Sequence, residues 1–258
     1  MSQYIRNFQK YRPLLYELVS RDVKIKYRKS VLGVLWTLLN PLLMMLILSF
    51  VFSHIFRFGV KNYPLYILSG QVVLNFFSES TSSAMSSILN NAPLIKKVYI
   101  PKYLFTLSRI ASSFINILAS FSALILVMVF TRTELYYTAF LSFIPILFLV
   151  VFSLGIGLIL AAITVKFRDI IHLWGVFLTA LTYLTPIIYP ISVLSSKVAF
   201  IVNLNPLTWM VGMFRDLMIY NTMPSAITFI GSAVVSVLTL VIGLFVFYKR
   251  QDTFIMDI

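Results

Sequence analysis

Residues 139–165 read AFLSFIPILFLVVFSLGIGLILAAITV and contain no charged side chain. A helix needs about 20 apolar residues to cross the hydrocarbon core of a bilayer, so this stretch is long enough to span a membrane. Outward from it lie five more long segments, separated by more polar connections. They cover residues 31–56, 64–89, 103–130, 170–188 and 225–248, and 64–89 is less apolar than the others. The sequence therefore predicts an all-α integral membrane protein with six transmembrane helices.

The composition supports this class and excludes several others. Of 258 residues, 60% are apolar and 11% are charged, whereas soluble domains average about 45–50% and about 25%. The absence of cysteine excludes disulfides, iron–sulfur clusters and thiolate zinc sites. The chain also lacks the P-loop, HExxH and GxSxG motifs, which argues against a self-contained enzyme. We therefore expect energy for any pumping to enter through Glu79 or through another polypeptide.

The net charge of +13 is interpreted as a topology signal rather than as a nucleic-acid site. When the lysines and arginines are assigned to the connections between spans, 16 of the 21 fall on one side and five on the other. The positive-inside rule places the side with 16 in the cytoplasm. Both termini are then cytoplasmic, which requires an even number of spans, and no nucleic-acid partner is expected.

The N-terminal residues 1–30 are basic and amphipathic. On a helical projection of residues 14–29, two faces separate: one carries Tyr16, Val19, Val23 and Tyr27, and another carries Glu17, Arg21, Lys24 and Arg28. This pattern is typical of a helix that lies in the membrane interface. The alternative is a basic anchor that only sets the topology.

The cytoplasmic connection 90–102 is too apolar for a solvated loop and too short to cross the membrane. Pro93 and Pro101 bound a piece that can form at most two helical turns. Because charged Lys96 and Lys97 follow them, we expect Leu94 and Ile95 to be exposed and to meet a partner surface. The alternative is a loop folded against the lipid headgroups.

Residues 189–224, on the outer face, form a connection too long for a plain loop. The apolar runs 198–202 and 207–214 predict two short interfacial or re-entrant helices, and Pro206, Trp209 and Arg215 belong to this region. The pair could gate an outer exit, or residues 207–220 could pack passively as a lid.

A polar face marks the second span. Gln71, Asn75, Glu79, Ser82 and Ser86 follow one another at helical spacing and fall on one side of the helix. Polar groups are costly in hydrocarbon, so this face must meet protein or water, and an intramembrane carboxylate is a functional candidate. The alternative is a Glu79 satisfied by Ser and Asn of neighbouring helices.

Small and polar residues elsewhere in the spans are interpreted as packing positions. They recur every four residues at 153, 157 and 161 and again at 108, 112, 116 and 120. Such patterns let transmembrane helices approach closely.

Five stretches resemble motifs of the permease subunits of ABC type-2 exporters of polysaccharides, and they follow one another in the same order as in that family. The first holds RD at 21–22, KYRKS at 26–30, LG at 32–33, LW at 35–36 and NPL at 40–42. The second is NAPLIKKVYIP at 91–101, where Ile100 replaces the usual Phe. The others are KFRD at 166–169, TPIIYP at 185–190 and NPL at 205–207.

This resemblance implies a homodimer in the bacterial inner (plasma) membrane that works with two copies of a separate P-loop ATPase. ATP and Mg²⁺ would be bound by that ATPase and no cofactor by this chain. The substrate would be a lipid-linked polysaccharide, such as O-antigen, capsule or teichoic acid, and membrane lipids would surround the permease.

The same resemblance divides a single permease domain, 1–258, into functional parts. Residues 1–30 would form the interface helix, 31–188 the first five spans, 189–224 the periplasmic gate region, 225–248 the last span and 249–258 a cytoplasmic tail. The residues expected to matter are Arg21, Asp22, Tyr27 and Arg28 in the interface helix, Asn91, Pro93, Leu94, Ile95, Lys96 and Lys97 in the ATPase-coupling segment, and Pro206, Trp209 and Arg215 in the gate.

A passage for a hydrated glycan needs groups that bind sugar weakly and repeatedly. Neutral hydrogen-bonding side chains and aromatic faces suit this need, so the predicted channel-lining residues are Gln71, Asn75, Glu79, Ser82, Tyr183 and Tyr189. Two rival functions stay open at this point. One is an ABC type-2 exporter of small lipids or drugs, and the other is a proton-coupled secondary transporter that uses Glu79.

Overall fold

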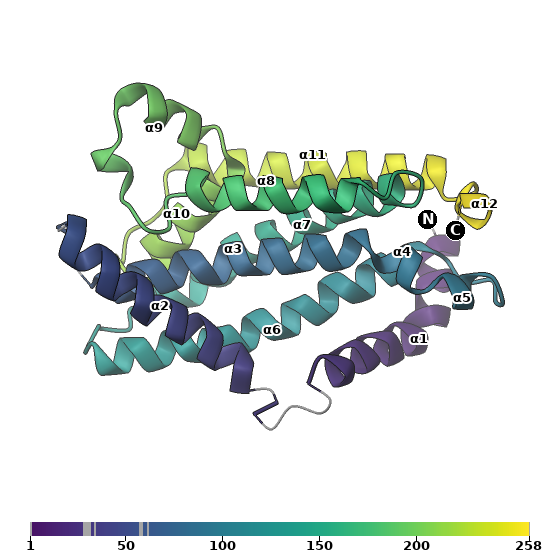
Figure 1. The fold of residues 1–258 in the computed structure, drawn as a ribbon, viewed down its shortest axis with the longest axis horizontal. Helices are drawn as coiled ribbons and strands as arrows, with labels where there is room; N and C mark the ends of the chain where they lie inside the picture. The colour runs from purple at the N-terminus through teal and green to yellow at the C-terminus, as the bar shows by residue number, and fades with distance from the viewer. Residues whose placement is uncertain (1, 28–31, 34, 57–58, 61, 258) are drawn as a thin grey trace.

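The computed structural model describes residues 2–27, 32–33, 35–56, 59–60 and 62–257, and these residues form helices joined by turns, with no strand among them. Figure 1 shows the long helices running lengthwise through the molecule. They are α2 (Leu35–Phe56), α3 (Tyr63–Met85), α6 (Tyr103–Phe130), α7 (Phe143–Thr164), α8 (Ile170–Leu184) and α11 (Ala226–Arg250). The prediction of an all-helical protein is confirmed.

Among the described residues, four helical stretches are long and apolar enough to cross a membrane. They are α2 over 35–53, α6, α7 together with the preceding 3-10 helix η1 (Tyr137–Ser142), and α11. The other two predicted spans correspond to α3, whose exposed side is polar, and to α8, which has 15 residues. The count of six spans therefore stays a prediction.

Helix α3 lies at the centre of the core. Its apolar side chains Leu65, Leu68, Phe76 and Phe77 are buried in the main hydrophobic cluster, which also draws on α6, α7 and α10. The ring of Phe77 stacks on that of Phe152 of α7, with 5.5 Å between the centroids. Because this side of α3 is fixed by packing, its polar side is held in a defined direction.

Glycines bring α7 into backbone contact with its neighbours. A Cβ atom built on Gly155 would lie 2.4 Å from the main-chain carbon of Thr239 in α11, and one on Gly243 would lie 2.4 Å from the carbonyl oxygen of Gly155. On another side, a Cβ on Gly157 would lie 2.8 Å from that of Ala84 in α3. Small residues are therefore required where α7 crosses α11 and α3.

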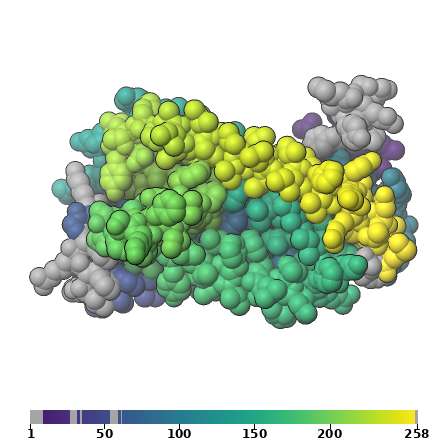
Figure 2. Space-filling model, turned by 90° about the horizontal axis from the view of Figure 1, so that it is seen from above, coloured from purple at the N-terminus to yellow at the C-terminus, as the bar shows by residue number. Residues whose placement is uncertain are grey.

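Short elements gather at the two ends of the long helices. In Figure 1, α1 (Ser2–Tyr27), α4 (Ser87–Asn90), α5 (Ala92–Ile95) and α12 (Phe254–Asp257) lie at one end. The opposite end holds η2 (Ile191–Val193), α9 (Ser196–Asn203) and α10 (Pro206–Met218). Figure 2 views the face along which α8 and α11 run. Residues 189–224 thus hold two α-helices, α9 and α10, after the short 3-10 helix η2, and their gating role stays a prediction.

Candidate functional site

A polar groove opens between α2, α3 and α6, next to the end of α1. Its volume is about 670 Å³, and amide, hydroxyl and carboxylate groups from all three helices line it. We call it the polar groove; it includes Lys26, Thr37, Asn40, Gln71, Asn75, Ser78, Glu79, Ser82, Ser83, Asn116 and Ser120. The groove follows from the periodicity of α3, because the face opposite the packed core carries its polar residues.

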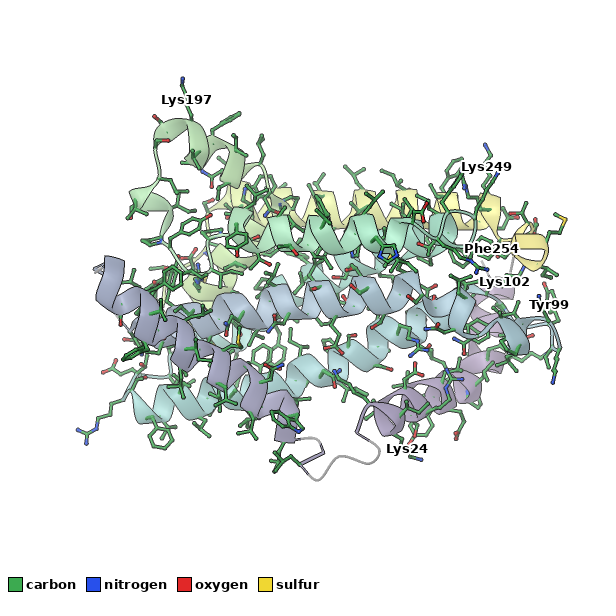
Figure 3. The ribbon with its side chains drawn as sticks, viewed as in Figure 1. Lys24, Tyr99, Lys102, Lys197, Lys249 and Phe254 are labelled. Carbon is green, nitrogen blue, oxygen red and sulfur yellow. The ribbon has the colours of Figure 1, made fainter. Side chains whose placement is uncertain are left out.

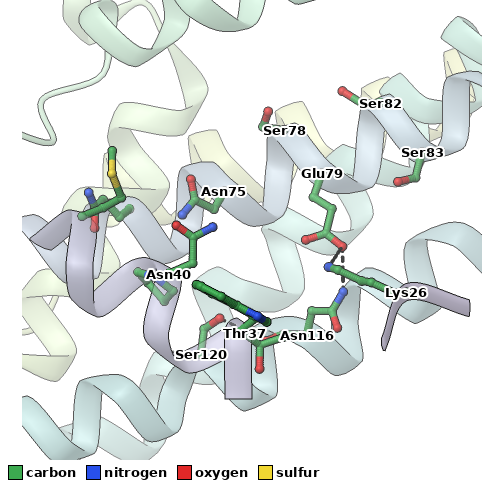
Figure 4. Close-up of a pocket in the computed structure, with 14 residues that line it drawn as sticks. Lys26, Thr37, Asn40, Asn75, Ser78, Glu79, Ser82, Ser83, Asn116 and Ser120 are labelled. Atoms are coloured by element: carbon green, nitrogen blue, oxygen red, sulfur yellow. Dashed lines mark hydrogen bonds and ion pairs between the residues drawn. The ribbon is translucent and has the colours of Figure 1, made fainter. Parts of the chain in front are cut away.

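Glu79 is bound by residues from two other helices. Figure 4 shows its carboxylate between Lys26 of α1 and Asn116 of α6. The Lys26 Nζ and the Asn116 Nδ2 each donate to Glu79 Oε1 at 2.7 Å. The site therefore neutralises the Glu79 charge with a cation and an amide donor.

A second cavity, of about 460 Å³, adjoins this ion pair between α1, α3 and α6. It shares Lys26, Glu79, Ser83 and Asn116 with the polar groove and adds Asp22 and Arg109. Lys26 and Glu79 thus stand where the two cavities meet, and the end of α1 closes this side of the groove.

The structure brings together four of the six predicted channel-lining residues. Gln71, Asn75, Glu79 and Ser82 all line the polar groove. Tyr183 and Tyr189 are absent from its lining and lie at and beyond the end of α8, where the Tyr189 hydroxyl donates to the Tyr183 carbonyl. A role in transport stays a prediction for all six residues.

Sequence reasoning missed several groove residues. Asn116 and Ser120 were assigned to helix packing, but both line the groove, and Asn116 binds Glu79. Asn40, next to the proline of α2, was quoted only as part of the NPL motif at 40–42, and it also lines the groove. The four-residue spacing of Asn116 and Ser120 was the available signal, but it did not indicate which helix would face them.

A charged cluster joins α1 to α5 and α6 at the end of the molecule that the predicted topology places in the cytoplasm. Arg21 Nη2 donates to Asp22 Oδ1 at 3.1 Å and to Asn91 Oδ1 at 3.0 Å. Asp22 Oδ2 also forms an ion pair with Arg109 Nη1 of α6 at 3.3 Å. The predicted interface residue Arg21, which also binds Asp22, therefore contacts the predicted coupling residue Asn91.

Of the other two residues predicted for the interface helix, the structure describes one. Tyr27 is the last residue of α1, and Arg28 lies outside the described residues. Asn91 is buried and also donates to the carbonyl of Ser87 at 2.7 Å, which holds the start of α5 against α4.

The expectation that Ile95 is exposed for docking was wrong. Its side chain is only 7% exposed because it belongs to a second hydrophobic cluster, formed at this end by residues from α1, α4, α5, α6, α7, α11 and α12. Leu94 packs partly against the same cluster. The exposed members of the segment are Pro93, Lys96 and Lys97, followed by the apolar Val98 and by Tyr99, which is 91% exposed.

Arg215 of α10 is buried at the other end of the molecule. Its guanidinium donates to three main-chain carbonyls, those of Pro186 at 2.7 Å, Tyr66 at 2.9 Å and Ile187 at 3.3 Å. It also donates to Ser69 Oγ at 3.2 Å and lies 3.5 Å from the centroid of the Tyr66 ring.

Burial lowers the pKa of the Arg215 guanidinium, but an arginine side chain stays protonated in proteins. A charged Arg215 therefore ties α10 to α3 and to the turn after α8. Gly70 allows this arrangement, since a Cβ atom there would lie 2.7 Å from Arg215 Nη2.

The other two predicted gate residues also lie on α10. Pro206 opens the helix, and the preceding Asn205 caps it by accepting from the Leu207 amide at 3.0 Å. The Asn205 side chain also donates to Thr185 Oγ1 at 3.0 Å, at the end of α8. Trp209 packs against Gly231 of α11, where a Cβ atom would lie 3.0 Å from the indole ring. The start of α10 is thus anchored to α8 and α11.

A family model described as "ABC-2 type transporter" matches residues 13–219 of the chain. The matched region runs from α1 to the end of α10, so it contains the polar groove, the Arg21–Asn91 cluster and Arg215.

Curated relatives align over almost their whole length. The O-antigen export system permease protein RfbA of Myxococcus xanthus is 30% identical over 98% of this chain and 98% of its own. A protein of the same name from Klebsiella pneumoniae is 28% identical over 93% of both chains. The polysialic acid transport protein KpsM of Escherichia coli is 24% identical over 91% of this chain and 92% of its own.

Proposed function

The chain belongs to the ABC-2 type transporter family, and we propose from this premise that it is the membrane-spanning permease subunit of a polysaccharide exporter. The substrate would be a lipid-linked polysaccharide moved from the cytoplasmic side across the inner membrane. The observation that carries the proposal is the end-to-end similarity to a protein named for O-antigen export, with 98% of both chains aligned.

The polar groove suits this substrate class. Sugars present hydroxyl groups, and the groove offers amides and hydroxyls on three helices, such as Asn40 of α2, Asn75 of α3 and Ser120 of α6. Neutral hydrogen-bonding groups favour the weak and repeated contacts that movement of a polymer requires. Of the described residues that line the groove, Glu79 alone carries a carboxylate, and it is already paired with the cation of Lys26.

The two rival functions have less support. The aligned relatives are named for O-antigen and polysialic acid, not for drugs or small lipids. A proton carrier needs a carboxylate that binds and releases a proton, whereas Glu79 is engaged by Lys26 and Asn116. Neither observation favours a second candidate function.

We propose that two copies of the chain assemble as a homodimer through α2 and α8. Large apolar side chains are exposed along both helices, for example Leu43, Ile47 and Phe50 on α2 and Leu173 and Val176 on α8. Within α8 only Leu181 is buried. A second copy would cover these side chains and enclose the groove that α2 borders.

The proposed permease has six spans and cytoplasmic termini, and a separate ATPase binds ATP and Mg²⁺. The location of α1 and α12 at one end of the long helices agrees with an even number of crossings. We propose that residues 91–99 seat on this ATPase, with Val98 and Tyr99 as the apolar contacts in place of Ile95.

The docking proposal is tested by changing Val98 and Tyr99 together to serine. Burial of two such side chains stabilises a contact by about 1.5–3 kcal/mol each, so the affinity for the ATPase should fall by about 100-fold or more, and little of a tagged ATPase should co-purify. Phe200→Ser is the matched control, because Phe200 is exposed on α9 at the opposite end. Wild-type ATPase recovery by the double variant would place the docking surface elsewhere.

Deletion of the gene tests the export function itself. We expect surface polysaccharide to disappear while lipid-linked polysaccharide accumulates inside the cell, and a plasmid copy of the chain to restore both. Unchanged surface polysaccharide in the deletion strain, with no other permease of this family present, would contradict the proposal.

A further inference from the structure

The chain folds back on itself after α11. The helix ends at Arg250, with Gln251 as its C-cap, and the amides of Thr253 and Phe254 donate to the carbonyls of Arg250 and Gln251 in a turn that leads into α12. Phe254, the first residue of α12, is only 1% exposed. The next two residues are exposed, and Met256 is 80% exposed. Among residues 251–256, Phe254 is therefore the buried one.

Phe254 enters the same hydrophobic cluster as the predicted coupling segment. That cluster contains Ile95 and Ile100, on either side of the exposed Val98 and Tyr99, together with Leu104 of α6. The Phe254 ring also meets the Phe247 ring of α11 edge-on, with 5.3 Å between the centroids.

Lys102 binds the tail from the other side of the coupling segment. Its ammonium donates to the Gln251 carbonyl and lies 5.8 Å from the centroid of the Phe254 ring. Figure 3 shows Tyr99, Lys102 and Phe254 at the same end of the molecule, opposite Lys197. The tail is therefore attached directly to the residue that precedes α6.

The coupling segment cannot hold its own position. Its helix α5 spans Ala92–Ile95, four residues, and a single turn is unstable in isolation. Asn91 fixes its start through Arg21. Beyond that point, Ile95 and Ile100 are buried in the cluster to which Phe254 belongs, and Leu94 packs partly against it.

We propose that Phe254 is a positioning residue for energy coupling: with Lys102, it makes the C-terminal residues 251–257 a clasp that holds the coupling segment 91–98 against α6 and α11. Movement of a docked ATPase would then move these helices as well, whereas a flexible coupling segment would move alone. The consequence for export rests on the proposed function, whereas the clasp itself is a property of the isolated chain.

Amide hydrogen exchange on the detergent-purified chain tests the clasp without any partner. The amides of Leu94–Val98 donate within the segment, to the carbonyls of Asn91, Ala92 and Leu94, so their exchange reports its order. Phe254→Ala should raise their exchange about tenfold or more, because it removes a large buried side chain. Met256→Ala, two residues away and exposed, should leave it unchanged. Wild-type exchange in Phe254→Ala would overturn the proposal.

A conservative variant keeps the proposal testable if Phe254→Ala does not fold. Phe254→Leu keeps most of the apolar volume, so exchange at 94–98 should rise by a smaller factor. In the cysteine-free chain, Lys102→Cys and Gln251→Cys joined by a short bis-maleimide should slow this exchange severalfold relative to the unlinked pair. Equal exchange before and after linking would refute the clasp even if Phe254→Ala is not produced.

Coupling is measured as polysaccharide exported per ATP hydrolysed by the complete exporter. Phe254→Ala should lower this ratio severalfold at wild-type protein level, and Phe254→Leu should restore most of it. An unchanged ratio in Phe254→Ala would overturn the coupling role. Absence of export by the wild-type complex would instead count against the proposed function and would leave the exchange result standing.

Discussion

Replacing Glu79 by glutamine and, separately, by leucine distinguishes a structural role of this side chain from a proton-carrying one. In the wild-type chain, Glu79 Oε1 accepts from Lys26 Nζ and from Asn116 Nδ2, each at 2.7 Å. Glutamine keeps the shape and one oxygen acceptor but removes the charge. Leucine removes the charge and both hydrogen bonds.

The expected loss of stability follows from these two contacts. The side chains of Lys26 and Glu79 are 42% and 38% exposed, so solvent screens their ion pair and it contributes about 0–1 kcal/mol. Asn116 is nearly buried, and a hydrogen bond to a charged group contributes about 1.5–3 kcal/mol. Glu79→Leu should therefore destabilise the chain by about 2–4 kcal/mol, and Glu79→Gln by about 1 kcal/mol.

Two assays read out these variants. Thermal unfolding in detergent should rank them as wild type, Glu79→Gln and Glu79→Leu, with Ser78→Ala as a groove-lining control that stays near wild type. Export by cells should survive in Glu79→Gln, because no proton transfer is required of this residue. Loss of export in Glu79→Gln, at normal protein level and with normal ATPase binding, would refute this reasoning and support a proton-coupled transporter.

Three further predictions concern helix packing and topology. Arg215→Met should destabilise the chain by about 3–6 kcal/mol in detergent, because three main-chain carbonyls lose a charged donor. Unchanged thermal unfolding would contradict the role of Arg215 in holding α10 against α3 and the turn after α8. Gly155→Leu should sharply reduce the amount of folded protein, since even a Cβ atom there overlaps the α11 backbone, whereas Gly175→Leu, with nothing within 4 Å, should be produced normally. In intact cells an impermeant maleimide should label Lys197→Cys but not Lys96→Cys, and labelling at position 96 would reverse the topology.

Features that depend on local periodicity were predictable from the sequence. The apolar runs anticipate the long helices, and the helical spacing of Gln71, Asn75, Glu79 and Ser82 anticipates that they share one groove. The short helix α5, with Pro93 in its first turn, also follows from local rules. In each case the information lies within a few turns of one helix.

Features that depend on distant contacts were not predictable in the same way. Lys26 lies 53 positions from Glu79, and no pattern in either helix indicates that they meet. Ile95 was expected on the surface because its neighbours are charged, but its burial depends on residues such as Phe254, far along the chain. The partners of Arg215 are main-chain carbonyls, which every residue type carries, so the sequence does not indicate where Arg215 binds.

ATP-dependent movement of lipid-linked polysaccharide across a membrane containing this chain is the most direct measurement of the proposed function. Inverted membrane vesicles carrying the chain and its ATPase would be given the glycolipid on the outside, and the protected fraction would be followed with time. We expect accumulation inside the vesicles that requires ATP and is lost when the P-loop lysine of the ATPase is replaced. Accumulation that proceeds without ATP hydrolysis and follows an imposed proton gradient would contradict the assignment of this chain as an ABC exporter permease.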